Sequence, residues 1–177
     1  MKILDIGCGP GTYVRAMREA GLCAFGIDLG VTPSDYLKRE DILAPDFDET
    51  GYDLALCLEV AEHIPGQFAE LFVLRVVQTA PIVIFSAAPP GQGGEGHVNL
   101  QPKSYWIDHF ARHGFVADSL ATMHLLDFLK KGEHMGWLVN NAIIFRQYGD
   151  LCFHRIEDEE RPQAVRLATY IKAADWN

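Results

Sequence analysis

The chain has 177 residues, a formal net charge of −9 at pH 7, and 49% hydrophobic and 22% charged residues. This length suits one domain of roughly 100–200 residues, and the composition argues against disorder. The acidic balance argues against nucleic acid as the main partner, because duplex-binding proteins present a basic face. No apolar run reaches the roughly 18 residues that cross a membrane. Four cysteines without a CxxC pair, and no secretion signal, predict a cytoplasmic protein that does not act at a membrane.

Strands and helices alternate along the predicted chain. Residues 2–6 form a short apolar run typical of a buried strand, and residues 12–20 have the spacing of a helix that ends at Gly21. Residues 23–28 are the next strand, so this unit predicts a parallel sheet. The remaining predicted elements are a short helix at 34–39, strands at 52–58, 82–86, 115–118 and 141–148, helices at 67–78, 102–112, 120–130 and 161–174, and a long loop at 87–101.

The glycine-rich turn after the first predicted strand carries the strongest chemical signal. Gly7, Gly9 and Gly11 allow a sharp turn and a close approach to a ligand, because they carry no Cβ. The following helix offers free N–H groups and a partial positive charge at its N-terminus. A pyrophosphate-binding turn would have the spacing GxGxxG, whereas position 12 is Thr. Asp5 at the strand end would repel a pyrophosphate and suits a cation or an amine.

The segment DIGCGPGT resembles the first motif of the class I S-adenosylmethionine-dependent methyltransferases. Further blocks resemble this family in order and position, and the resemblance spans most of residues 2–148. A carboxylate at the end of the second strand, Asp28, lies where open α/β sheets bind ligands. The matching blocks are DIGCGPGT at 5–12, GID at 26–28, REDI at 39–42, and YDLALCL at 52–58 followed by EVAEH at 59–63.

The resemblance implies both fold and domain organisation. It implies an α/β fold with a single Rossmann-like, doubly wound, mostly parallel sheet of seven strands and helices on both faces. Residues 1–150 would form the S-adenosylmethionine-binding methyltransferase domain. Residues 151–177 would form a linker, acidic at 157–160, and a C-terminal helix packed on the same domain.

The same resemblance assigns ten residues to S-adenosylmethionine, whose product after transfer would be S-adenosylhomocysteine. Alternative roles remain open for Ile42, as a core residue, and for Asp41, as a turn cap. The assigned residues are Asp5, Gly7, Gly9 and Gly11 for the amino-acid half, Asp28 for the ribose, Leu29, Asp41 and Ile42 for the adenine, and Leu58 and Glu59 for the methionine part.

Two histidines are the catalytic candidates. His63 follows the fourth parallel strand of the family pattern, and His97 lies in the glycine-rich loop after the next strand. Both strand ends should face one crevice, where either histidine could act as a general base for a protonated acceptor. The alternatives are a capping or supporting role for His63 and a turn-stabilising role for His97.

The segment GHVNLQPKSYW at 96–106 resembles a block found in a subset of small methyltransferases that modify small molecules or glycans. A long glycine-rich loop in a compact domain is usually functional, and this one could cover the acceptor as a lid. Tyr105 and Trp106 are expected in the core rather than on a substrate platform.

Other candidate sites are weaker. His109 and His113 have the spacing of metal ligands on a helix, but no third ligand accompanies them, so they are expected to be a surface pair and no metal site is predicted. Cys8 is expected to be a small filler in the turn. Neither the catalytic cysteine motif of pyrimidine carbon methyltransferases nor the NPPY motif of amino-group DNA methyltransferases is present.

The sequence therefore favours a methyltransferase that acts on an O or N atom of a small molecule or saccharide. Family members usually carry a helical segment before the first strand, so the acceptor side is expected to be open or completed by residues 123–136, the C-terminal helix, or another subunit in a homo-oligomer or with a partner subunit. The alternatives are a non-catalytic binding or regulatory subunit and a nicotinamide-dependent oxidoreductase, against which the glycine spacing and Asp5 argue.

Overall fold

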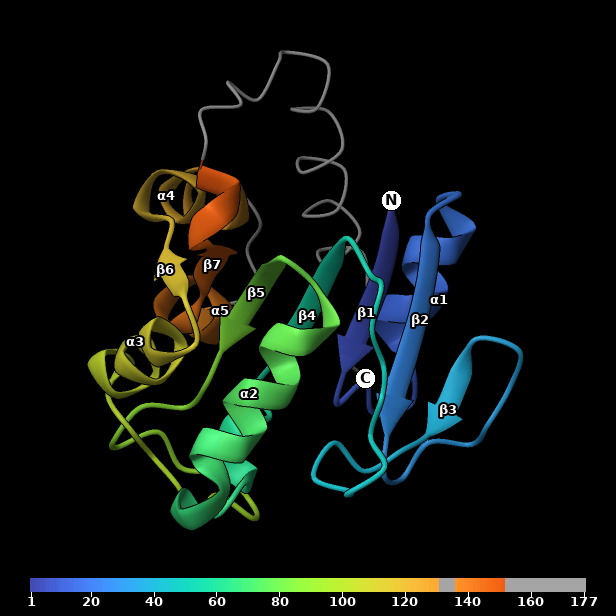
Figure 1. Ribbon diagram of the computed structural model, residues 1–177, viewed down its shortest axis with the longest axis horizontal. Coiled ribbons are helices and arrows are strands. Elements are labelled where there is room, and N and C mark those ends of the chain that lie inside the picture. The colour runs from blue at the N-terminus through green and yellow to red at the C-terminus, as the bar shows by residue number, and fades with distance from the viewer. Residues whose placement is uncertain (131–135, 152–177) are drawn as a thin grey trace.

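The computed structural model describes residues 1–130 and 136–151. Its seven strands form one sheet in the order β3-β2-β1-β4-β5-β7-β6 (Figure 1). β1 to β5 run parallel, and β7 is antiparallel to both of its neighbours. The strands are β1 (Lys2–Ile6), β2 (Cys23–Asp28), β3 (Leu37–Arg39), β4 (Leu54–Leu58), β5 (Ile82–Ser86), β6 (Phe115–Ala117) and β7 (Ile143–Gln147).

Helices cover both faces of this sheet. The strand order reverses direction between β1 and β4, which makes that junction the point where open α/β sheets bind ligands. The helices are α1 (Thr12–Glu19), α2 (Ala69–Thr79), α3 (Lys103–Arg112), α4 (Ser119–Lys130) and α5 (Gly136–Asn141), with shorter 3₁₀ turns η1 (Ala61–His63), η2 (Gly66–Phe68) and η3 (Tyr148–Leu151). The predicted doubly wound, mostly parallel seven-stranded α/β fold is thus confirmed.

Alternation along the central strands builds two separate cores. In β4, Leu54, Leu56 and Leu58 point to the face covered by α1, α4 and α5, whereas Ala55 and Cys57 point to the face covered by α2 and α3. All five residues are buried, because a parallel strand between helical layers has no solvent face. Trp106 lies fully buried in the second core against Phe85, as predicted for the core.

Two predicted elements and the predicted exposure of one histidine need correction. Residues 34–39 are not a helix. The Ser34 N–H donates to the Leu37 carbonyl in a turn, and Leu37–Arg39 then forms β3, which pairs with β2 and completes the sheet of seven strands. The last strand starts at Ile143 rather than at 141, because the short helix α5 precedes it. His109 is buried rather than on the surface. The predicted helix at 161–174 and the acidic linker at 157–160 lie outside the described residues. So do residues 131–135 of the segment 123–136, which was expected to complete the acceptor side.

The carboxyl ends of β1, β2, β4 and β5 meet at one edge, the lower edge in Figure 1. The long loop 87–101 leaves β5 at this edge and, as predicted, forms no helix or strand. Within residues 1–130 and 136–151, no helix is long and apolar enough to span a membrane.

Candidate functional site

The turn between β1 and α1 is shaped by two close approaches. Gly7 and Gly11 have φ of +72° and +81°, a region that L side chains rarely adopt. A Cβ on Gly7 would overlap the Val60 side chain, and one on Gly11 would lie 2.7 Å from a Leu37 methyl carbon. Gly9 instead has open space where a Cβ would stand. The turn is thus packed on two sides and open at Gly9.

Asp5 lies at the end of β1 beneath this turn and is 2% exposed. Its Oδ2 has no hydrogen-bond partner among the described residues. Burial, and secondarily the charge of Asp28, raises the pKa of Asp5 to about 8. A buried carboxyl without a partner favours a ligand that brings a positive group, such as an ammonium.

Asp28 ends β2 and holds the turn from the other side. One carboxylate oxygen accepts the Gly9 N–H at 3.0 Å, and the other accepts the Gly30 N–H at 2.7 Å. A pocket of about 590 Å³ opens beside it, with Pro10 and Tyr36 in its lining. This volume is within the range of roughly 300–1,000 Å³ that small-molecule sites occupy. The carboxylate keeps lone pairs free for hydroxyl donors in that pocket.

The other residues assigned to the nucleoside differ in their environment. Leu29 is 66% exposed directly after Asp28, so its apolar side chain is available to cover a ligand. Asp41 accepts the Leu43 N–H at 2.9 Å and thereby caps its own turn. Ile42 is buried in the core with Leu4. The turn-cap and core alternatives thus describe Asp41 and Ile42 in this structure, and their contact with an adenine stays a prediction.

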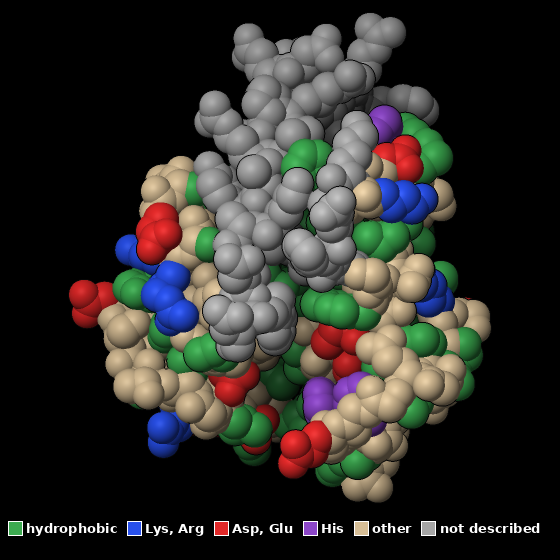
Figure 2. Space-filling model, turned by 180° about the vertical axis from the view of Figure 1, so that it is seen from behind, with side chains coloured by type: hydrophobic (Ala, Val, Ile, Leu, Met, Phe, Trp, Pro, Cys, Tyr) green, Lys and Arg blue, Asp and Glu red, His purple; other side chains and the backbone are tan. Residues whose placement is uncertain are grey.

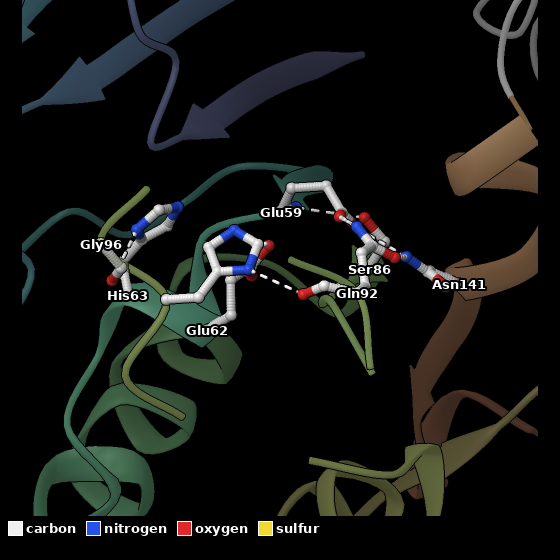
Figure 3. Close-up of polar contacts among 8 residues, drawn as sticks. Glu59, Glu62, His63, Ser86, Gln92, Gly96 and Asn141 are labelled. Carbon is white, nitrogen blue, oxygen red and sulfur yellow. Dashed lines mark hydrogen bonds and ion pairs between the residues drawn. The ribbon is translucent and has the colours of Figure 1, made fainter. Parts of the chain in front are cut away.

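Glu59 follows β4 in a strained conformation. It is the one non-glycine residue with positive φ in the described part of the chain, at +54°. Its N–H donates to the Ser86 carbonyl, and its carboxylate accepts amide N–H groups of Gln92 at 2.7 Å and Asn141 at 3.1 Å. Figure 3 shows the Glu59 carboxyl directed toward these partners and away from Glu62 and His63. Left-handed backbone costs about 1–3 kcal/mol and concentrates at functional sites.

Gln92 and Asn141 are residues that sequence reasoning missed. Asn141 also donates to the Gln92 side-chain oxygen at 2.9 Å and is 4% exposed. For Gln92, the only sequence signal was its place in the glycine-rich loop. Asn141 was assigned to a strand, and nothing in the sequence indicated that its side chain belongs to the site. Leu58, by contrast, packs in the core beneath this network.

The two catalytic candidates lie together at the same edge. The His63 and His97 rings meet edge to face, with centroids 5.0 Å apart, and the His97 Nε2 lies 3.9 Å from a Glu62 carboxylate oxygen. Glu62 is fully buried, and desolvation together with the charge of Glu59 raises its pKa to about 7. Figure 2 shows histidine and acidic side chains together on one face of the molecule. Sequence reasoning named both histidines and missed Glu62 as their partner.

The second histidine pair has a different surrounding. His109 on α3 and His113 directly after it contact the carboxylate of Glu70 on α2, at 2.7 Å and 2.9 Å. Arg112 contacts the same carboxylate. This cluster clamps two helices together on the face opposite α1. Cys8 fills space beside Gly26, as predicted, and burial raises the pKa of its thiol to about 12, which argues against a nucleophile.

Comparisons with known proteins agree with this geometry. A family model described as a methyltransferase domain matches residues 1–74. The ubiquinone biosynthesis O-methyltransferase of Saccharophagus degradans is 29% identical over 173 residues, which cover 88% of this chain and 68% of that protein. The enzyme of the same name from Alkalilimnicola ehrlichii is 31% identical over 148 residues, covering 75% and 52%. The chain thus spans between about half and two thirds of the length of these relatives.

Solved structures of distant sequence share the fold. The small RNA methyltransferase HEN1 superimposes with a TM-score of 0.61 at 16% identity, over 84% of this chain and 24% of that one. The magnesium protoporphyrin IX methyltransferase of Synechocystis, solved with bound S-adenosylmethionine, gives 0.57 at 17% identity, over 82% and 68%. Residues 1–74 thus match a methyltransferase domain, most of the chain is similar in sequence to O-methyltransferases, and its fold is shared with a methyltransferase solved with bound S-adenosylmethionine.

Proposed function

We propose that this protein transfers the methyl group of S-adenosylmethionine to a hydroxyl oxygen of a small molecule. The curated relatives are O-methyltransferases by name, and they match over most of this chain. Oxygen is therefore favoured over nitrogen as the acceptor atom. The acidic balance of the chain supports an acceptor other than a nucleic acid.

The residues around the turn fit this cofactor. The buried, unpartnered oxygen of Asp5 would be satisfied by an ammonium group, and Asp28 presents free lone pairs for ribose hydroxyls beside an open pocket. The open position at Gly9 leaves room for a ligand against the backbone. A pyrophosphate would meet the Asp5 carboxyl instead, which argues against the nicotinamide alternative.

One contact carries the proposal. Val60 belongs to the segment that connects Glu59 to His63, and its side chain packs on Gly7 in the turn. The cofactor turn and the His63–His97–Glu62 cluster therefore share one edge of the sheet. Methyl transfer requires this adjacency, because the acceptor oxygen must approach the methyl carbon in line with the bond that breaks.

The chain positions the reactants and removes a proton. S-adenosylmethionine, when bound, supplies a methyl group on a positively charged sulfur. The acceptor oxygen would bond to this carbon as the carbon–sulfur bond breaks, and the hydroxyl proton would pass to a residue of this chain. We assign activation of that hydroxyl to the cluster of His63, His97 and Glu62, whose accepting atoms lie within 4.8 Å of one another.

Several finer features belong to the same proposal. Residues 1–150 form the catalytic domain, and the acceptor is a phenol or a saccharide. The acceptor side is completed within this chain, by a second copy of it, or by a partner subunit. Cys8, Cys23 and Cys57 are free thiols in the described part of the chain, which supports the predicted cytoplasmic location.

A product assay tests the proposal. The full chain is incubated with S-adenosylmethionine and a panel of phenols, catechols and monosaccharides, and S-adenosylhomocysteine is quantified. Turnover with a hydroxyl acceptor is expected, and His97→Ala should lower it while leaving cofactor binding intact. His113→Ala is the matched control, because His113 lies in the other histidine cluster. Binding of NAD in place of S-adenosylmethionine, or equal losses in both variants, would contradict the assignment.

A further inference from the structure

Three potential metal ligands converge at the edge of the sheet. Glu62 and His63 belong to the turn η1 after β4, whereas His97 comes from the loop after β5. Each offers one ligand atom, and these atoms lie within 4.8 Å of one another. Bonds of about 2.1 Å would place two ligand atoms at most roughly 4.2 Å apart, so small side-chain rotations close the set around one ion.

Glu62 needs a positive partner. Its side chain is fully buried, and neither carboxylate oxygen has a partner with hydrogen-bond geometry among the described residues. The backbone N–H groups of Glu62 and Ala88 lie close enough to offset only part of the desolvation. An isolated buried carboxylate is strongly unfavourable, and such groups in proteins are paired or coordinate metals.

Both histidines present the correct nitrogen. The Nδ1 of His63 faces the Gly96 carbonyl at 3.2 Å (Figure 3). The Nδ1 of His97 faces the Gln92 carbonyl at 3.3 Å. A carbonyl can only accept, so each Nδ1 carries the proton and each Nε2 keeps a lone pair. Metal-binding histidines usually have this arrangement, in which a backbone oxygen fixes the other ring nitrogen.

The loop is built to bring His97 to Glu62. Val98 and Asn99 donate their N–H groups to the Glu62 carbonyl at 2.9 Å and 3.0 Å, which ties the loop to η1. A Cβ on Gly94 would overlap the His97 ring, so this glycine permits the close packing of the imidazole. Two backbone anchors and one glycine thus set the position of the third ligand.

We propose that Glu62, His63 and His97 bind one divalent first-row transition metal ion, such as Zn²⁺, whose open coordination positions take the oxygen of the acceptor. Two imidazoles favour a transition metal over Mg²⁺ or Ca²⁺, which prefer oxygen ligands. Three protein ligands are typical of catalytic sites that leave a position for substrate. A bound hydroxyl loses its proton more readily next to such an ion. This inference rests on the proposed function and deepens it.

Metal titration tests the site directly. The full chain, freed of metal by chelation, is titrated with Zn²⁺ by calorimetry and with Co²⁺ by visible absorption, which reports nitrogen and oxygen ligation. One equivalent per chain is expected. Glu62→Gln and His97→Ala should each lower Zn²⁺ affinity by more than the roughly 10- to 100-fold that loss of an outer-shell partner causes. His63→Gln, at an exposed position, provides a second variant in case Glu62→Gln fails to fold.

The control and the remaining readouts separate the outcomes. His113→Ala should bind Zn²⁺ like wild type; an equal loss there, no stoichiometric binding, or unchanged affinity in folded Glu62→Gln would overturn the site. Turnover that chelation leaves unchanged would show an imidazole acting alone as base, and would overturn the inference while the proposed function stands. S-adenosylmethionine binding is measured on the same samples, so a failure of the proposed function is seen separately.

Discussion

The cofactor turn and the histidine cluster lie side by side but are built in opposite ways. The turn is contiguous: β1, three glycines and α1 follow one another, and Asp28 closes the unit at the end of the next strand. The cluster combines Glu62 and His63 of η1 with His97 from the loop that follows β5. The adjacent hydrogen bonds of Glu59 add Asn141 from α5. A contiguous site is visible as a motif, whereas an assembled one depends on how the strands are ordered.

Each region contains a buried carboxyl group with at least one oxygen that accepts no hydrogen bond from the described residues. Asp5 and Glu62 have pKa values raised to about 8 and about 7, in both cases chiefly by burial. Asp5 lies near the end of β1 under the glycine turn, whereas Glu62 lies in η1, which follows the neighbouring strand β4, beside the two histidines. Two such carboxyl groups at one edge of the sheet agree with the two positive groups proposed above, the ammonium of the cofactor and a metal ion.

Removing the Asp28 carboxylate, which is predicted to bind the ribose, should have the largest effect. Asp28→Ala loses the carboxylate that holds the turn and would bind two hydroxyls, and hydrogen bonds to charged groups contribute about 1.5–3 kcal/mol each. We expect S-adenosylmethionine and S-adenosylhomocysteine affinity to fall by about 100-fold or more, measured by calorimetry. Asp41→Ala is the matched control with a smaller loss, because Asp41 caps its own turn. Equal losses would place the main nucleoside contact elsewhere.

The packing of the glycine turn against the segment 59–63 can be disrupted by a substitution at one position. Gly7→Ala and Gly21→Ala both force an alanine into positive φ, but only at Gly7 does the new Cβ overlap a neighbour, Val60. Gly7→Ala should therefore destabilise the protein by about 1–3 kcal/mol more than Gly21→Ala, since overpacking adds to backbone strain. Urea unfolding of both variants measures the difference. Equal stabilities would mean that the Val60 side chain moves to make room for the new Cβ, and that the glycine turn and the segment 59–63 are not tightly packed.

The buried carboxyl under the turn makes stability depend on pH. Asp5 keeps its proton in the folded protein up to about pH 8, whereas the unfolded chain releases it near its ordinary pKa of 3.8. The free energy of unfolding without cofactor should therefore fall as pH rises from about 4 to 8, by up to about 1.4 kcal/mol per pH unit. Asp5→Asn should flatten this slope in urea titrations between pH 5 and 8. The exposed Asp46→Asn should not, and a slope shared by all three proteins would assign it to another group.

The smallest effect is expected at the second histidine cluster. Glu70→Gln weakens contacts to His109, His113 and Arg112, but Glu70 is about half exposed, and surface pairs contribute at most about 1 kcal/mol. Thermal unfolding should show a modest loss, with S-adenosylmethionine and Zn²⁺ binding unchanged. A change in either binding constant would show that the helix clamp reaches the site.

Two errors in the prediction have the same physical origin. Residues 34–39 contain no strong strand signal, and Leu37–Arg39 becomes β3 only because the edge of β2 offers backbone partners. In the sequence, Gln92 and Asn141 look like ordinary loop and strand residues, and only the fold brings both side-chain amides to the Glu59 carboxylate. Propensity describes what a segment prefers alone, and these segments are decided by neighbours distant in sequence.

The amino-acid sequence by itself determined the βαβ unit, the glycine turn with Asp5 and Asp28, and the two histidines at strand ends, because each depends on the local chemistry of a few consecutive residues. Only the tertiary structure decided which groups meet. The order of β1, β4 and β5 brings Glu62 to His97 and sets Val60 on Gly7. Periodicity reports which face of a strand is buried, but strand order arises from the packing of two helical layers on one sheet.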